Sequence, residues 1–157
     1  MASKVYIETT VVSYLTSKPS RDVITAGHQQ TTVEWWETRR TQFDLFTSQF
    51  VLDEASLGDP FEAGKRNEVL VKLLLLVINA EVTRLGRKLI EDRALPPKAA
   101  TDALHVAISS VSKMDYLLTW NCRHLANATL FKRVAAICQA AGHDCPIICT
   151  PEELMEI

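Results

Sequence analysis

The stretch DALHVAISSVSKMDYLLTWN, residues 102–121, decides the fold because it joins an amphipathic helix to a short buried strand. Apolar side chains recur along its first half at helical spacing and form one stripe. The stripe consists of Ala103, Leu104, Ala107, Ile108 and Val111. The apolar run at 116–119 is typical of a strand that helices cover on both faces. The stretch therefore predicts one helix-to-strand unit of an α/β protein.

The same alternation of strands and helices extends along the whole chain. Further strands are expected at residues 5–8, 43–47, 74–78 and 146–149. Helices are expected over about 9–15, 23–41, 48–57, 62–73, 79–90, 97–111 and 129–141, and a capping box at 150–153 predicts a final short helix. This order implies right-handed parallel crossovers. We therefore predict one domain over residues 1–157, a three-layer α/β/α sandwich around a five-stranded parallel sheet.

The most apolar segment of the chain, residues 69–78, is interpreted as core. Together with Trp35 and Trp36, part of this apolar surface is also a candidate for a dimer or partner interface, because aromatic side chains are enriched at such interfaces.

Composition and charge exclude several classes of protein. Hydrophobic residues make up 47% of the 157 residues and charged residues 23%, which is ordinary for a globular chain and not for a disordered one. The formal net charge is −2, so binding of nucleic acid would depend on a local basic patch or a bound metal ion. No apolar run reaches the roughly 18 residues of a membrane-spanning helix. The N-terminal MASKVYIETT also lacks the apolar region of a signal peptide, so we expect a cytoplasmic protein with no membrane partner.

Polar side chains follow the ends of two predicted strands. Glu8 closes the first strand, and Thr119 and Asn121 close the fourth. Glu54 and Asp102 lie on the helices that follow the second strand and precede the fourth. Because sites in parallel sheets form outside the carboxyl ends of the strands, we expect these five residues to converge.

The chemistry of this set points to a divalent cation. Three carboxylates repel one another unless a cation joins them, and oxygen ligands suit Mg²⁺ or Mn²⁺. Such a site predicts metal-assisted hydrolysis of a phosphodiester. His105, one turn after Asp102, is interpreted as a structural histidine.

The segments that carry these residues resemble the PIN domain family, in particular VapC-like toxin nucleases and PilT N-terminus-like proteins. They are VYIETTVVSYL (5–15), TSQFVLDEASLGD (47–59), ALPPKAATDALHVAIS (94–109) and MDYLLTWNCRHLAN (114–127). The resemblance implies a parallel sheet of order 3-2-1-4-5 and a Mg²⁺- or Mn²⁺-dependent ribonuclease site. It also implies a homodimer and, as in many members, a small antitoxin that neutralises the toxin.

Carried over by position, the first three acids of the family fall on Glu8, Glu54 and Asp102, the fourth acidic position on Asn121, and the hydroxyl before it on Thr119. Two positions depart from the family pattern, because Glu8 and Asn121 each stand where the family commonly has Asp. The four metal-ligating positions then carry a formal charge of −3 instead of −4, so we expect weaker binding of the metal.

The resulting prediction is a metal-dependent endoribonuclease of the VapC type that acts on RNA. One alternative is a PIN-fold RNA- or protein-binding regulatory module with a weakened metal site. Another is a receiver-like phosphoryl-transfer domain, but Asn79 and Thr150 stand where a receiver would carry Asp and Lys. Basic residues at 84–93, or Lys65 and Arg66, are candidates for contact with the RNA backbone, although a solvated helix face explains them as well.

Overall fold

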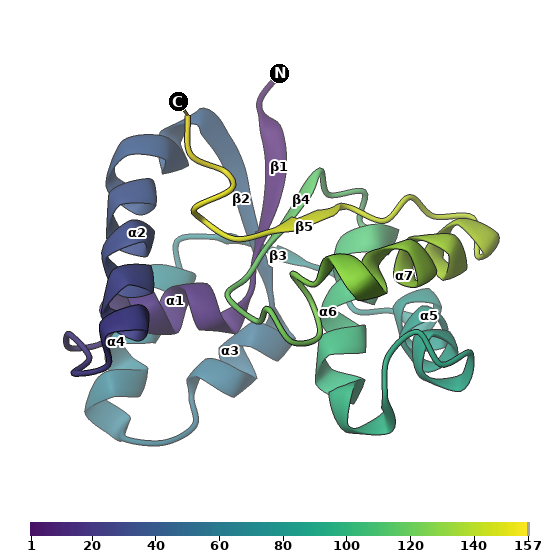
Figure 1. Ribbon diagram of the computed structural model, residues 1–157, viewed down its shortest axis with the longest axis horizontal. Helices are drawn as coiled ribbons and strands as arrows, with labels where there is room; N and C mark the ends of the chain where they lie inside the picture. Colours follow the sequence, from purple (N-terminus) through teal and green to yellow (C-terminus); the bar gives the residue numbers. More distant parts are fainter. Residues whose placement is uncertain (157) are drawn as a thin grey trace.

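A five-stranded, all-parallel sheet forms the centre of the computed structural model, which describes residues 1–156 (Figure 1). Its strands are β1 (Ser3–Ile7), β2 (Phe43–Ser48), β3 (Leu74–Leu76), β4 (Tyr116–Leu118) and β5 (Ile147–Cys149). Their order in the sheet is β3-β2-β1-β4-β5. Both the fold class and the strand order predicted from the sequence are confirmed.

The helices form two groups on opposite sides of the sheet (Figure 1). One group contains α1 (Thr9–Thr16), α2 (Val23–Arg39), α3 (Gln49–Ala55) and α4 (Pro60–Leu70). The other contains α5 (Ala80–Glu91), α6 (Ala100–Val111) and α7 (Ala128–Ala140). Short 3-10 turns at Arg40–Gln42 and Pro97–Ala99 complete the set. No helix within residues 1–156 has the length and apolar character that a membrane crossing requires.

Local side-chain chemistry explains where several helices begin and end. The Ser48 hydroxyl accepts a hydrogen bond from the backbone N–H of Val51 at the start of α3. The Asn79 side chain does the same for Val82 at the start of α5. Gly142 follows α7 with a φ of 88°, a left-handed conformation that favours glycine. Short-range signals in the sequence therefore mark one boundary of each of these three helices.

The prediction of a short final helix is wrong, although the capping box at 150–153 forms. The backbone N–H of Thr150 donates to the Glu153 carboxylate, and the N–H of Glu153 donates to the Thr150 hydroxyl. Only turns follow at 151–155. The cap satisfies the first turn by itself, and a helix this short gains too few further hydrogen bonds to offset the cost of nucleation.

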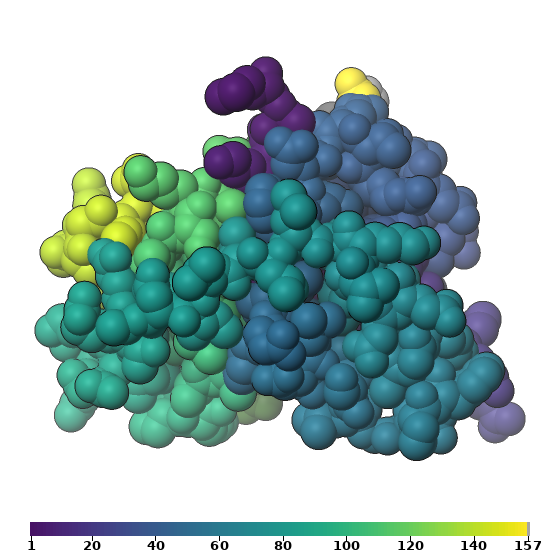
Figure 2. Space-filling model, turned by 180° about the vertical axis from the view of Figure 1, so that it is seen from behind, coloured from purple at the N-terminus to yellow at the C-terminus, as the bar shows by residue number. Residues whose placement is uncertain are grey.

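The interpretation of residues 69–78 as core is also wrong for most of the segment. Val71 is 73% exposed, Leu74 63%, Leu75 52% and Val77 70%. β3 is the edge strand of the sheet, and α5 packs against α6 instead of covering it. We call Val71, Leu74, Leu75, Val77 and Ile78 the β3 apolar edge. Figure 2 shows the teal part of the chain, which includes this segment, at the molecular surface.

β3 is also shorter than expected, because its pairing partner ends. The last paired residues of the two strands are Ser48 of β2 and Leu76 of β3. Ser48 then becomes the N-cap of α3, so β2 offers no further backbone groups for pairing.

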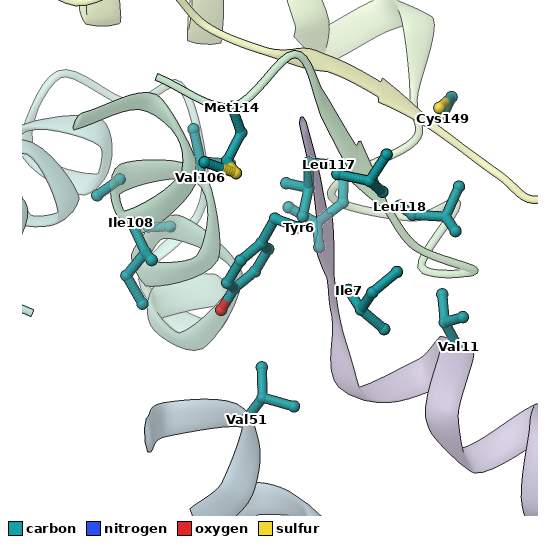
Figure 3. Packing of buried hydrophobic residues seen from close by; sticks show 14 of the residues in the cluster. Tyr6, Ile7, Val11, Val51, Val106, Ile108, Met114, Leu117, Leu118 and Cys149 are labelled. Carbon is teal, nitrogen blue, oxygen red and sulfur yellow. The ribbon is translucent and has the colours of Figure 1, made fainter. Parts of the chain in front are cut away.

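The core lies around β1 and β4, and this packing positions the candidate site. Ile7, Leu117 and Leu118 are fully buried, and Figure 3 shows them at the centre of the apolar cluster. Ile7 pairs with Leu118, and the backbone N–H of Glu8 donates to the Leu118 carbonyl at 3.2 Å. The residues that follow the two strands therefore leave the sheet at the same edge.

We predict that truncation of a buried side chain in the inner strand β4 is far more costly than truncation at the sheet edge. Leu118→Ala removes a fully buried side chain and should lower the free energy of unfolding by about 2–5 kcal/mol. Ile147→Ala, at a residue that is 57% exposed in β5, should cost less than about 1 kcal/mol. Urea unfolding followed by circular dichroism measures both values, and equal losses would contradict the assignment of the core.

Candidate functional site

Glu8 is a buried carboxylate that joins α1 to the end of β4. It is only 4% exposed and is the N-cap residue of α1. Its Oε1 accepts hydrogen bonds from the backbone N–H of Thr10 at 3.1 Å and from the Thr10 hydroxyl. The same oxygen accepts from the Thr119 hydroxyl at 2.7 Å. One carboxylate oxygen thus fixes the start of a helix against the end of a strand far away in the sequence.

Thr119 and Asn121 extend this network to Asp102. The Thr119 hydroxyl accepts from the backbone N–H of Asn121 at 2.9 Å. The Asn121 side-chain amide then donates to Oδ1 of Asp102, also at 2.9 Å. The structure therefore brings four of the five expected residues into one hydrogen-bonded chain, which we call the carboxylate network: Glu8, Thr119, Asn121 and Asp102.

Glu54 lies beside this network without a direct hydrogen bond to it. Its Oε1 accepts from the Thr9 hydroxyl at 2.5 Å and from Nε2 of His105 at 2.8 Å. Thr9 is the neighbour of Glu8 in the sequence, and His105 lies one helical turn after Asp102 on α6. Glu54 is thus tied to the same two elements that carry the network.

His105 connects Glu54 to the interior of the protein. Nδ1 of His105 lies 2.9 Å from the Tyr6 hydroxyl, which in turn lies 2.8 Å from the Ser48 hydroxyl. An ionised carboxylate can only accept, so Nε2 of His105 carries a proton. Burial raises the pKa of Tyr6, so its hydroxyl stays protonated and available as a donor. The chain of contacts runs from Glu54 to the N-cap of α3 and fixes the orientation of the glutamate.

The two accessible acids of the site differ in their electrostatics. Burial acts to raise the pKa of Glu54, but hydrogen bonds from His105 and Thr9 and attraction to His105 outweigh it and leave the pKa below its usual value. For Asp102 the effect of burial is the larger one. Its pKa is raised despite His124, His105 and Asn121, each of which favours the charged form. Of these two acids, Asp102 is therefore the one whose negative charge is less well compensated.

The sequence analysis did not single out three of the groups that orient these acids, namely His124, Thr9 and Thr10. His124 places Nδ1 3.2 Å from Oδ2 of Asp102, and Thr9 and Thr10 hold the two glutamates. His105 was interpreted as structural, and it does pack in the core, but it also contacts Glu54. Hydroxyl residues directly after a strand-terminal glutamate were a signal in the sequence that could have identified Thr9 and Thr10.

The donor chemistry of the site suits a hard divalent cation. Oε2 of Glu8 and Oε2 of Glu54 accept no hydrogen bond from the described residues. Among those residues, the buried side-chain polar atoms without a partner are Nε1 of Trp35 and Nε of Arg39, so neither glutamate oxygen is sealed from solvent. Glu8 and Glu54 thus each keep one carboxylate oxygen with spare lone pairs, and oxygen donors of this kind suit Mg²⁺ or Mn²⁺.

The side chains are nevertheless not arranged around a common point. Within residues 1–156 no three His, Cys, Asp or Glu side chains are placed to share one metal ion. Each acid is turned toward hydrogen-bond donors of its own. Oδ1 of Asn121, the atom that would ligate a cation, accepts from the backbone N–H groups of Arg123 and His124 at 3.1 Å each. Metal ligation by these residues therefore stays a prediction.

Comparison with known proteins supports the fold. The chain is similar to one in the crystal structure of VapBC2 from Rickettsia felis bound to a DNA fragment from their promoter, with a TM-score of 0.60. The match covers 94% of this chain and 98% of that chain at 15% sequence identity. No protein-family model matches the sequence, and a search of curated proteins finds no similar sequence. With its sheet order, the protein has a PIN-like fold.

We predict that Asp102→Asn does not destabilise the metal-free protein at neutral pH. Because burial raises the pKa of Asp102, the folded state favours its protonated form. The stabilising contribution of this group is present below the ordinary pKa of an aspartate and is lost as the pH rises through the folded-state value. Asparagine is uncharged, and its amide can accept from Asn121 and donate to His124.

Urea unfolding in EDTA tests this prediction. At pH 7 the variant should match or exceed the free energy of unfolding of the wild type, and this advantage should shrink toward pH 4. A typical point substitution costs about 1 kcal/mol. A loss of that size at pH 7 would contradict the view that the Asp102 charge is poorly compensated.

Proposed function

We propose that this protein is a PIN-type endoribonuclease that hydrolyses RNA phosphodiester bonds with the help of Mg²⁺ or Mn²⁺. The observation that supports it most is the carboxylate network, which collects Glu8, Asp102, Asn121 and Thr119 at the carboxyl edge of the central strands. Glu54 is held beside it. A set of acids at this edge of a parallel sheet is in the position where sites form in α/β proteins.

The proposed roles follow from the contacts of each side chain. Glu8, Glu54 and Asp102 would hold the cation, with Asn121 as a further oxygen ligand once its amide turns. When bound, such an ion supplies positive charge to the phosphate and polarises the attacking water. Thr10 and Thr119 orient Glu8, and Thr9 and His105 orient Glu54, in the way that neighbours of metal ligands set their direction.

Two of the basic residues considered for RNA contact, Lys65 and Arg66, have partners within the protein. Lys65 pairs with Glu62, and Arg66 donates to the carbonyls of Ala55 and Leu57, so both serve the local structure. Arg123 is exposed and follows Asn121 by two residues. We therefore assign contact with the RNA backbone near the site to Arg123 in preference to Lys65 and Arg66.

Cleavage of labelled RNA in Mn²⁺ tests the proposal. Asp102→Asn and Glu54→Gln should each lower the cleavage rate by at least about 10- to 100-fold, because each removes a charge from the site. Glu91→Gln, on the exposed end of α5, is the matched control and should stay within about twofold of the wild type. EDTA should abolish cleavage by the wild type, and equal cleavage by the wild type and Asp102→Asn would reject the assignment.

A second candidate function is a PIN-fold RNA- or protein-binding regulatory module with a weakened metal site. One observation favours it: no three acidic or other metal-ligating side chains of residues 1–156 surround a common point. This function requires that RNA or a protein partner binds while millimolar Mn²⁺ produces neither heat in calorimetry nor a thermal shift. Mn²⁺ binding that Asp102→Asn removes would decide for the nuclease.

We further propose that the protein acts in the cytoplasm as the toxin of a type II toxin–antitoxin pair, with a small antitoxin as partner, and that it forms a homodimer. The likeness to a chain of the VapBC2 assembly supports the antitoxin partner. The β3 apolar edge supports the dimer, because an open edge strand with exposed apolar side chains favours pairing with another chain. Two copies related by a twofold axis would bury the same patch on each protomer.

Sedimentation at micromolar concentration tests the homodimer. The wild type should sediment at about twice the chain mass of 17.6 kDa. Leu74→Asp places a charge in the β3 apolar edge and should produce the monomer, whereas Val23→Asp, at an exposed apolar residue at the start of α2, should leave the dimer intact. A wild-type monomer would remove the homodimer from the proposal.

A further inference from the structure

Three aromatic rings stack beside the carboxylate network. The His28 ring on α2 lies 4.0 Å from the Trp120 ring, centroid to centroid, with an angle of 13° between the ring planes. Tyr14 on α1 lies 6.1 Å from Trp120 at 27° and 6.4 Å from His28 at 22°. The three planes are therefore nearly parallel, although the residues come from three separate elements. We call Tyr14, His28 and Trp120 the ring stack.

The ring stack is fixed directly to the groups that orient Glu8. Trp120 stands between Thr119 and Asn121 in the chain, and its backbone N–H donates to the Thr10 hydroxyl at 2.8 Å. That hydroxyl donates to Glu8. A substrate phosphate at the carboxylate network would thus have these rings as close neighbours.

The innermost ring is locked in place. The indole N–H of Trp120 donates to the Thr32 hydroxyl at 2.7 Å, and Thr32 donates to the His28 carbonyl, also at 2.7 Å. Thr32 is fully buried and Trp120 is 8% exposed. Trp120 therefore serves as a rigid backing for the other two rings.

The outer rings have a different environment. Tyr14 and His28 are half-buried, so parts of both rings face solvent. No side chain among the described residues makes a hydrogen bond to the Tyr14 hydroxyl or to a ring nitrogen of His28. These two rings are therefore placed by stacking and apolar packing, without a side-chain hydrogen bond, which is the arrangement of an aromatic platform for a nucleobase.

We propose that Tyr14 and His28, backed by Trp120, form a stacking subsite for an unpaired nucleobase of the RNA substrate. This inference rests on the proposed function for the location of the phosphate. Every base has a π face, so the subsite would select single-stranded or looped RNA over a duplex and would tolerate different bases. The connection between α1 and α2 carries the exposed cations Lys18 and Arg21, which suit the adjoining backbone phosphates.

Binding without cleavage tests the subsite. The probe is a fluorescently labelled single-stranded oligoribonucleotide, titrated in EDTA and followed by anisotropy. His28→Leu and Tyr14→Leu replace the ring with a bulky aliphatic side chain, and each should weaken binding by about 5- to 100-fold. His28→Phe and Tyr14→Phe keep the ring and should bind within about threefold of the wild type. His143→Leu, at a histidine that pairs with Glu81 away from the site, is the matched control and should bind as the wild type does.

A second series needs no change to the protein. Oligonucleotides that lack one base at a time should reveal one position at which the wild type loses about tenfold or more in affinity, and His28→Leu should lose nothing further there. A blunt RNA duplex should bind weakly to the wild type and equally to both leucine variants. Uniform affinity across all base-free positions would overturn the inference, as would unchanged binding by folded His28→Leu and Tyr14→Leu.

The two proposals can fail separately. If the wild type cleaves RNA but the leucine variants bind it normally, the ring stack is only packing between α1, α2 and the end of β4, and the stacking subsite is rejected. If the ring-dependent binding is present and no cleavage occurs with Mn²⁺, the nuclease is rejected and the subsite remains.

Discussion

The candidate site of this protein depends on the hydrogen bonds that one buried carboxylate oxygen of Glu8 accepts. Three donors from Thr10 and Thr119 converge on Oε1, and they join the first turn of α1 to the end of β4. A carboxylate buried this deeply would be costly without such donors. The hydrogen bonds compensate the charge and also set the geometry at the carboxyl edge of the sheet, where Asn121 and Asp102 continue the chain of contacts.

The negative charges of Glu54 and Asp102 are compensated to different degrees. Glu54 is stabilised as a carboxylate by His105 and Thr9, whereas burial leaves Asp102 with a raised pKa. Of these two acids, Asp102 is therefore the one whose negative charge is less stabilised by the protein. A cation at the site would gain from the charge of Asp102 without competing for the donors that hold Glu8, which connects the electrostatics of the fold to the proposed chemistry.

Short-range sequence patterns were sufficient to predict the five strands and the helix caps at Ser48 and Asn79. The order of the strands in the sheet was predicted from the family resemblance. The position of polar residues after strands also predicted which acids lie at the same edge. What the sequence could not supply depends on packing between distant residues. The Tyr6 hydroxyl meets Ser48 and His105, which lie 42 and 99 residues away. The exposure of β3 likewise depends on where α5 packs, which an apolar run does not reveal.

The orientation of Asn121 illustrates the same limit on a smaller scale. Its residue type predicted an oxygen ligand, but the turn that follows β4 uses that oxygen for two backbone N–H groups and directs the amide to Asp102. The ring stack could not be predicted from the sequence for a related reason. Its three residues come from three separate parts of the chain with no shared sequence motif.

The most direct test of the central claim is a crystal structure of the protein soaked in millimolar Mn²⁺, with anomalous differences used to locate the ion. The account predicts an anomalous peak in contact with carboxylate oxygens of Glu8, Glu54 or Asp102, at the carboxyl edge of β1 and β4. Well-ordered crystals with Mn²⁺ bound elsewhere, or with no peak at this edge, would contradict it.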